Sequence, residues 1–236
     1  MSTVTVKTQV ELDSALAAAG PFTEIVIDSP RGLWLELSSS GSASVRAFGS
    51  ASVRASGSAS VSAFDSASVS AFDSASVRAF DSASVSASKF VAVHLFSGRV
   101  TLEGGVLIDL TALDLDDLDQ WLDYTGAQVE GEDLLLYKAV DTSLRSGKGF
   151  EYPVGAAVVC PDWTDTNECG GGLHLCPTPH QAFSYFGSAT RFLRCRVARA
   201  DVRPIGDPHE VAKCKVRALT VEAEVDINGR ELAVTA

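Results

Sequence analysis

Residues 42–89 read SASVRAFG SASVRASG SASVSAFD SASVSAFD SASVRAFD SASVSASK, which is one octapeptide repeated six times. In each copy, small apolar residues alternate with polar ones, as Ala59, Val61 and Ala63 do in the third copy. A period of two residues predicts a strand with one buried face. Exact repetition at a fixed spacing predicts a solenoid, because copies too short to bury a face alone must stack and share one core. We therefore expect a mainly β protein that begins with a right-handed parallel β-helix.

The coil of this solenoid should contain two copies, or sixteen residues, because eight residues cover one strand and one corner. Phe48, Phe64 and Phe80 lie sixteen residues apart and should form one ladder that faces solvent, with Phe72 on the opposite wall. Glycine and aspartate tolerate the backbone of tight corners. The predicted corner residues are Gly49, Gly57, Asp65, Asp73 and Asp81.

Both ends of the solenoid should be covered. A capping box at Thr8–Glu11 predicts a helix, and strands over residues 24–28 and 33–37 should close that end with large inward residues. The repeat pattern breaks near Gly98, and an acidic helix over residues 113–124 should cap the last coil. Capped ends argue against an open filament. The inward residues of the first coil are predicted to be Ile25, Ile27, Leu33, Leu35 and Leu37.

Charge and cysteine content restrict the partners and the cellular compartment that we expect for the protein. The net charge is −11, whereas direct binding to nucleic acid requires a basic surface. No signal-peptide pattern and no run of about twenty apolar residues is present, so we expect no membrane partner. Five cysteines, an odd number, are typical of a reduced cytoplasmic protein with free or metal-bound thiols.

The sequence changes character after the repeats. Residues 1–108 are predicted to form the solenoid, residues 109–133 an acidic capping helix and linker, and residues 134–236 a small α+β domain. In this last region, LLLYKAV, RFLRCRVARADV and KCKVRALTVEAEV are typical of strands, and GGGLHLCPTPHQAFSYF predicts a glycine turn, a strand and the start of a helix.

The region from Tyr137 to Val225 resembles an uncharacterised domain of actinobacterial and bacteriophage proteins, with a Gly-Leu-His-x-Cys motif at its centre. The octapeptides also resemble Ala-x-Val-x-Ala repeats of such proteins. Neither resemblance implies a known activity. The matching residues are Lys138, Gly149, Phe150, Tyr152, Gly155, Gly172, Leu173, His174, Cys176, Pro179, Ala182, Tyr185, Arg194, Cys195, Arg196, Val197 and the strand over residues 213–215.

A metal site is one interpretation of the motif. Cys160, Cys169, His174 and Cys176 have the spacing C-x8-C-x4-H-x-C, and thiolates with an imidazole are ligands that zinc prefers. The set lacks the close C-x2-C pair of a strong zinc signal. We therefore expect free thiols and no cofactor, with zinc as the alternative.

A catalytic site is another interpretation. The His174 strand, a helix with Tyr185, and a late strand with Glu222 and Glu224 look distantly like ADP-ribosyltransferase domains. That resemblance implies NAD as the ligand and these four residues as the site. The early arginine or histidine of such domains is missing, and Lys138 replaces it poorly. In the structural alternative, His174 caps the turn at residues 170–172 through a hydrogen bond to the backbone.

The hypothesis that these observations favour is a non-enzymatic binding or structural module, encoded by a phage, in which the solenoid presents the C-terminal domain to a protein partner. Gly172, His174 and Tyr185 are its candidate binding residues. The sequence contains no phosphate-binding loop, dinucleotide fingerprint or nucleophile elbow. The alternatives are the ADP-ribosyltransferase-like enzyme and an acidic nucleic-acid mimic that inhibits a host protein.

Overall fold

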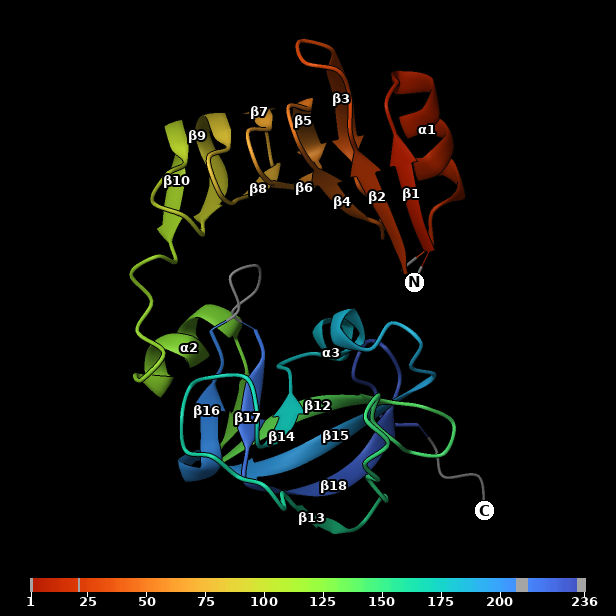
Figure 1. The fold of residues 1–236 in the computed structure, drawn as a ribbon, viewed down its shortest axis with the longest axis vertical. Helices are drawn as coiled ribbons and strands as arrows, with labels where there is room; N and C mark the ends of the chain where they lie inside the picture. The colour runs from red at the N-terminus through yellow and green to blue at the C-terminus, as the bar shows by residue number, and fades with distance from the viewer. Residues whose placement is uncertain (1, 21, 207–211, 233–236) are drawn as a thin grey trace. The chain divides into compact units, whose positions relative to one another are not determined.

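The computed structural model describes residues 2–20, 22–206 and 212–232. It divides the chain into two compact units, residues 1–112 and 113–236 (Figure 1). The first unit is a parallel β-solenoid and the second is a small α+β unit, so the predicted fold class is confirmed. None of the described helices is long and apolar enough to cross a membrane.

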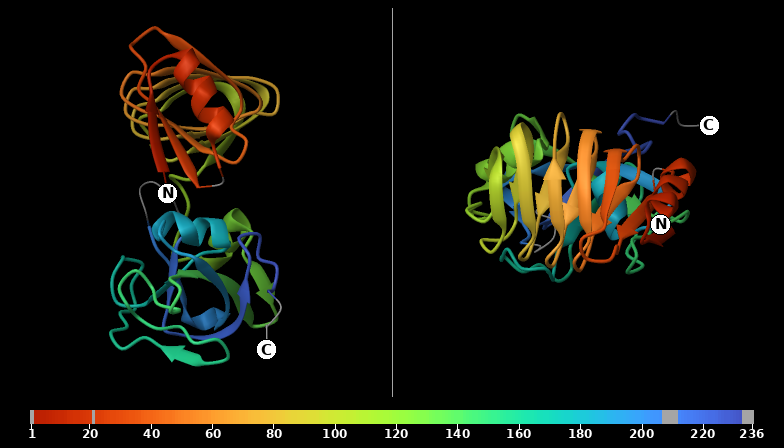
Figure 2. Two further views of the ribbon diagram at one scale, coloured as in Figure 1. Left: turned by 90° about the vertical axis from the view of Figure 1, so that its right-hand side faces the viewer. Right: turned by 90° about the horizontal axis from the view of Figure 1, so that it is seen from above.

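The solenoid consists of parallel strands in two walls. The order of hydrogen-bonded strands is β1-β2-β4-β6-β8-β9-β7-β5-β3, which runs along one wall and returns along the other. Strand β10 pairs with β9. The right panel of Figure 2 shows the coils stacked side by side. The elements are β1 (Ser2–Val6), α1 (Gln9–Ala18), β2 (Thr23–Ile27), β3 (Trp34–Ser39), β4 (Ser44–Ala47), β5 (Ser52–Ser58), β6 (Ser60–Ala63), β7 (Ser68–Ala71), β8 (Ser76–Ala79), β9 (Ser84–Leu95) and β10 (Thr101–Asp109).

The register of these strands confirms a coil of sixteen residues. Val61 pairs with Val77 on one wall, and Val69 pairs with Val85 on the other. Most of the inward alanines and valines are fully or almost fully buried: Ala63, Ala67 and Ala71 each have no exposed surface. The core is therefore narrow and made mostly of small side chains, as the repeat predicts.

The N-terminal end of the solenoid is closed by α1. Thr8 and Glu11 form the predicted capping box, and Leu12 and Ala15 pack into the solenoid core. The prediction that Leu33 points inward is wrong: it is 44% exposed, because it precedes β3 in the turn between the walls. Strand β1, which pairs with β2, has no counterpart in the sequence prediction.

The phenylalanine ladder exists, but it does not face solvent as expected. The rings of Phe48, Phe64, Phe80 and Phe96 stack with centroid distances of 4.6, 4.5 and 4.4 Å. Each ring covers the next, and the guanidinium of Arg46 lies 5.8 Å from the centroid of Phe64, so Phe64 and Phe80 are buried outside the Ala/Val core. Phe72, on the other wall, stacks on no aromatic ring among the residues that the structure describes, and it is 44% exposed.

The aspartates at the corners bind the neighbouring coil. Asp65, Asp73 and Asp81 have positive φ angles of 54°, 55° and 49°, which confirms the predicted turns. Each carboxylate also accepts a hydrogen bond from the backbone N–H of the residue sixteen positions earlier, over 3.1, 3.4 and 3.1 Å. These aspartates therefore connect coils as well as turn the chain.

The C-terminal end of the solenoid differs from the prediction. The coil continues past Gly98 into β10, with a register shift between Gly104 and Val106. The acidic helix is shorter than expected, α2 (Leu118–Thr125), and that it caps the last coil stays a prediction. Its apolar side chains, with Trp121 fully buried, belong to the core of the second unit because they pack on that unit's strands.

The second unit contains two antiparallel sheets. The larger has the order β11-β12-β15-β18-β13 and the smaller the order β14-β17-β16. A bridge between Tyr137 and Cys176 connects β12 to the end of β14. The elements are β11 (Gln128–Glu130), β12 (Asp133–Val140), β13 (Ala157–Val159), β14 (Leu173–Leu175), α3 (Pro179–Tyr185), β15 (Arg191–Ala198), η1 (Arg199–Asp201), β16 (Val202–Pro204), β17 (Cys214–Val216) and β18 (Ala218–Val225).

Candidate functional site

A cavity of about 840 Å³ in the second unit brings together most of the residues that the sequence singles out. Strand β12 contributes Lys138, β14 contributes His174, and α3 contributes Tyr185. The segment after β12 adds Lys148, and Lys213 lies just before β17. The candidate binding residue Gly172 and all four cysteine and histidine residues of the zinc hypothesis also line this cavity.

His174 lies beside a group of lysines. It pairs in register with Lys215, and its backbone carbonyl accepts a hydrogen bond of 2.8 Å from Lys138 Nζ. Burial, together with the positive charges of Lys138, Lys213, Lys148 and Lys215, lowers the pKa of its imidazole to about 4. Nε2 is buried without a hydrogen-bond partner among the described residues, so the expected side-chain cap on the glycine turn is not formed.

Lys138 forms part of the cavity wall. Its ammonium lies 5.1 Å from the ring centroid of Tyr152, in addition to the bond to His174. Burial lowers the pKa of Lys138 to about 8. The sequence prediction includes this residue in the family resemblance and treats it as a poor replacement for an arginine or histidine, but does not assign it to the binding site. Lys138 lies two residues from Leu136 and two from Val140 in an apolar strand, so it shares their face of the strand, and this pattern indicates partial burial.

Tyr185 lies at the end of α3, with 39% of its surface exposed. Lys213 Nζ lies 4.5 Å from the centroid of the Tyr185 ring. A cation over an aromatic face is an attractive arrangement that also fixes the ring orientation. Tyr185 and His174, which the sequence predicts as one site, therefore do line the same cavity.

The glycines before β14 permit a close approach of two chain segments. A Cβ atom on Gly171 would lie 1.7 Å from the carbonyl oxygen of Asp162, and one on Gly172 would lie 2.9 Å from the Cβ of Lys215. Lys215 is fully buried beneath this loop, and its Nζ donates to the hydroxyls of Thr164 and Thr166 over 3.2 Å each. The glycine turn therefore holds the loop over residues 160–172 in place.

The thiols of the zinc hypothesis do not converge. Cys160 donates to Asp162 over 3.0 Å, Cys169 is exposed with its sulfur 3.9 Å from Lys213 Nζ, and Cys176 is buried. Burial raises the pKa of the Cys160 thiol, which disfavours the thiolate that a metal needs. Within the described residues, no three side chains of histidine, cysteine, aspartate or glutamate are placed to hold a metal ion.

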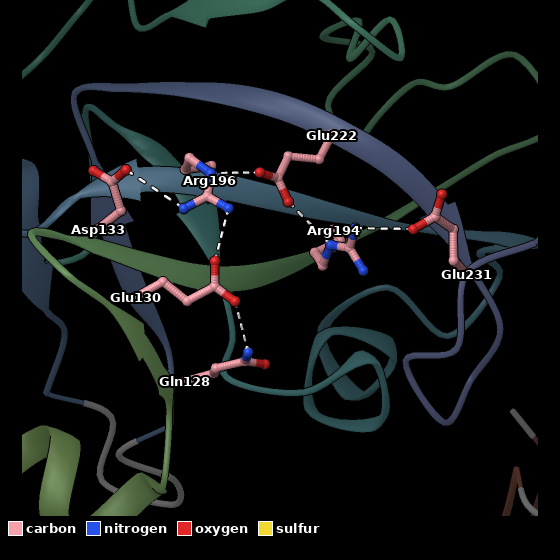
Figure 3. A network of polar contacts seen from close by, with 7 residues as sticks. All are labelled: Gln128, Glu130, Asp133, Arg194, Arg196, Glu222 and Glu231. Atoms are coloured by element: carbon pink, nitrogen blue, oxygen red, sulfur yellow. Dashed lines mark hydrogen bonds and ion pairs between the residues drawn. The ribbon is translucent and has the colours of Figure 1, made fainter.

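The two glutamates of the catalytic hypothesis do not line the cavity. Figure 3 shows Glu222 between Arg194 and Arg196. Lys138 pairs with Leu193 in the sheet, so the alternating Arg194 places this network on the opposite face. Burial opposes the charge of Glu222, but the two guanidinium groups lower its pKa overall. Glu224 forms an ion pair with Arg191, which lowers its pKa.

The wider network surrounds the two arginines of this face with carboxylates. Arg196 also contacts Glu130 over 2.8 Å and Asp133 over 3.5 Å, and Arg194 contacts Glu231 over 3.1 Å (Figure 3). The sequence prediction missed this network, although alternating arginines on one strand and glutamates on another are a signal for cross-strand ion pairs. The structure thus brings His174 and Tyr185 together and leaves Glu222 and Glu224 elsewhere.

Comparison with known proteins agrees with the predicted uncharacterised domain. No curated protein and no solved structure matches the chain. Residues 134–232 match a domain of unknown function, DUF7666. This range contains β13 to β18, all of β12 except Asp133, and every residue of the cavity described above. The similarity to DUF7666 therefore lies entirely within the second unit.

Proposed function

We propose that this protein is a non-enzymatic binding module, in which the solenoid serves as a stiff spacer and the cavity of the second unit recognises a protein partner. The observation that carries the proposal is the composition of the cavity. His174, Tyr185 and Lys138 line it, whereas Glu222 and Glu224 lie elsewhere in ion pairs with arginines. A carboxylate held by two guanidinium groups is poorly suited to act as a base or to polarise a substrate.

The solenoid suits the role of a spacer. Each of its coils is hydrogen-bonded to the next through backbone ladders, and the corner aspartates add bonds between coils. Contacts in a solenoid are confined to neighbouring repeats, so its length follows from the number of repeats. These properties support a structural function for residues 1–112.

We further propose that the protein is phage-encoded and acts in the cytoplasm of an actinobacterial host. The resemblance of the repeats and of the Gly-Leu-His-x-Cys motif to such proteins supports this origin. All five cysteines are free, which is compatible with a reducing compartment.

The test is partner capture by the full chain from host lysate. We expect a partner that the wild-type protein captures to be lost with Tyr185→Ala and retained with Glu132→Gln, an exposed control outside the cavity. Circular dichroism verifies that both variants fold. Equal capture by the Tyr185 variant would overturn the proposal.

A parallel assay separates the enzyme alternative. We expect the wild-type protein not to consume NAD. Consumption that disappears in Glu222→Gln would instead support an ADP-ribosyltransferase-like activity. That result would require the ion pairs of Glu222 with Arg194 and Arg196 to open.

A further inference from the structure

We propose that the cavity of the second unit binds a phosphate ester through the ammonium groups of Lys138, Lys148 and Lys213, with the organic part of the ligand against Tyr185. This inference rests on the proposed binding function and names the chemistry that the cavity recognises. The ester is either a small phosphorylated compound or a phosphorylated side chain of the protein partner.

The charge of the cavity is opposite to that of the chain. The protein has a net charge of −11, yet three lysines and a single carboxylate, Asp162, line the cavity. Asp162 already accepts a hydrogen bond from Cys160. A concave site lined by one sign of charge concentrates ligands of the other sign. The cavity is therefore suited to an anion.

Lys138 and Lys148 are not neutralised in the way that arginines of the second unit are. Arg191, Arg194 and Arg196 all form ion pairs with glutamates. In contrast, Lys138 and Lys148 form no ion pair with any residue that the structure describes. Lys138 is partly buried, and a partly buried ammonium without a counter-charge has lost hydration that an incoming anion would replace. The low pKa of Lys138 agrees with this uncompensated burial.

The type of cation indicates the type of anion. No guanidinium belongs to the cavity lining that the structure describes. Arginine matches planar carboxylates through paired hydrogen bonds, whereas lysine acts as a point charge that suits phosphate from several directions. Two or three ammonium groups around one cavity match the charge of about −2 that a phosphate monoester carries near neutral pH.

The size and the walls of the cavity accommodate more than an inorganic ion. Its volume of about 840 Å³ lies in the range of sites for small organic ligands. Tyr185 is 39% exposed and Phe150 is 36% exposed, and both line the cavity. Phe150 packs edge-on against Tyr152, with ring centroids 5.6 Å apart. These rings offer an apolar surface for the part of the ligand that carries the phosphate.

His174 provides a spectroscopic reporter of occupancy. Four charged groups face it: Lys138 from β12, Lys148 from the following segment, Lys213 just before β17, and Lys215 within β17. Their repulsion and burial disfavour the imidazolium. A bound phosphate would offset the lysine charges and so raise the pKa of His174, which NMR of the imidazole ring measures directly.

The test is titration of the full chain with four probes: adenosine monophosphate, adenosine, a phosphoserine peptide and the same peptide without phosphate. We expect at least one phosphorylated probe to bind with a Kd below about 1 mM and about tenfold or more tightly than its unphosphorylated form. Which phosphorylated probe binds more tightly distinguishes the small ester from the partner side chain.

Two charge-reversal variants complete the test. Lys148→Glu at the cavity should weaken binding about tenfold or more, whereas Lys89→Glu, an exposed lysine of the solenoid, makes the same change in net charge and should not. The proposal is overturned if neither phosphorylated probe binds, if phosphate gives no advantage, or if both variants behave alike. Loss of partner capture by Tyr185→Ala without phosphate binding would overturn this inference and leave the proposed function intact.

Discussion

The solenoid and the second unit use opposite ways of stabilising a chain. In the solenoid, equivalent residues lie sixteen positions apart in the same surroundings, as Val61 and Val77 do. In the second unit, partners come from distant segments and each environment occurs once, as when Lys215 bonds to Thr164, 51 residues away. A substitution in the solenoid should therefore have the same effect at every equivalent position, whereas the effect of a substitution in the second unit is specific to one residue.

The largest expected effect concerns where the second unit begins. A fragment of residues 113–236 should fold alone, because it retains α2 with the fully buried Trp121. A fragment of residues 133–236 should unfold, since deletion of one large buried aromatic side chain alone costs about 3–5 kcal/mol out of a total stability of about 5–15 kcal/mol. Circular dichroism and NMR dispersion measure the outcome. If the shorter fragment folds equally well, α2 is not part of this core.

Overpacking the solenoid should give the next largest effect. Ala67→Leu and Ala83→Leu replace fully buried alanines in equivalent positions of successive coils. Each should lower the free energy of unfolding by about 1–3 kcal/mol, and by similar amounts, because no space exists for the added atoms. Ser62→Thr on the outer face is the control and should change little. Urea denaturation gives the values, and clearly unequal costs at the two alanines would contradict the equivalence of the coils.

The corner aspartates allow a smaller test. Asp73→Ala should destabilise the solenoid by about 1–3 kcal/mol, because alanine is strained at a φ of 55° and the bond to the Gly57 N–H is lost. Asp73→Gly removes only the bond and should cost less. Thermal unfolding of both variants separates backbone strain from hydrogen bonding. A glycine variant that is as unstable as the alanine variant would show that strain contributes nothing.

The smallest effect concerns the pH dependence of the second unit. The folded-state pKa of His174 is lowered to about 4, below its ordinary value, so between about pH 6.5 and 4 the unfolded chain binds more protons. Stability should therefore fall as the pH falls through this window, by about 1 kcal/mol once partial exposure of the ring is considered. His174→Gln removes this group and should reduce the slope. An unchanged slope in the variant would assign it to other groups.

Repetition explains why the solenoid could be predicted in detail. The inward set around Val61 and the corners at Asp65 and Asp73 follow from the sequence because six copies state the same pattern. The burial of Phe64 could not be inferred, because it depends on rings stacked from neighbouring coils and not on the alternation within one strand. The prediction for Leu33 failed for a related reason: the two-residue alternation applies within strands, and this residue lies in the turn before β3.

The strands and the central motif of the second unit could be predicted from the sequence, but the arrangement of its candidate site could not. The sequence identifies His174 and Tyr185, and they do line one cavity. It does not indicate on which face of the sheet Glu222 lies, because a register shift beside Arg194 moves that residue to the arginine side. Nor does it reveal the lysines around His174, which come from three separate segments and meet only in the folded chain.

The sixteen-residue coil also limits how the chain length can change. Gain or loss of one octapeptide would preserve which residues point inward, yet it would transfer every later residue to the other wall. Phe80 would then no longer stack in the column that it shares with Phe48 and Phe64. The point at which the chain exits the last coil would move by half a turn of the coil. Gain or loss of two octapeptides would restore every alignment. Duplication and deletion in this gene should therefore be tolerated in multiples of forty-eight nucleotides, and single copies should be selected against.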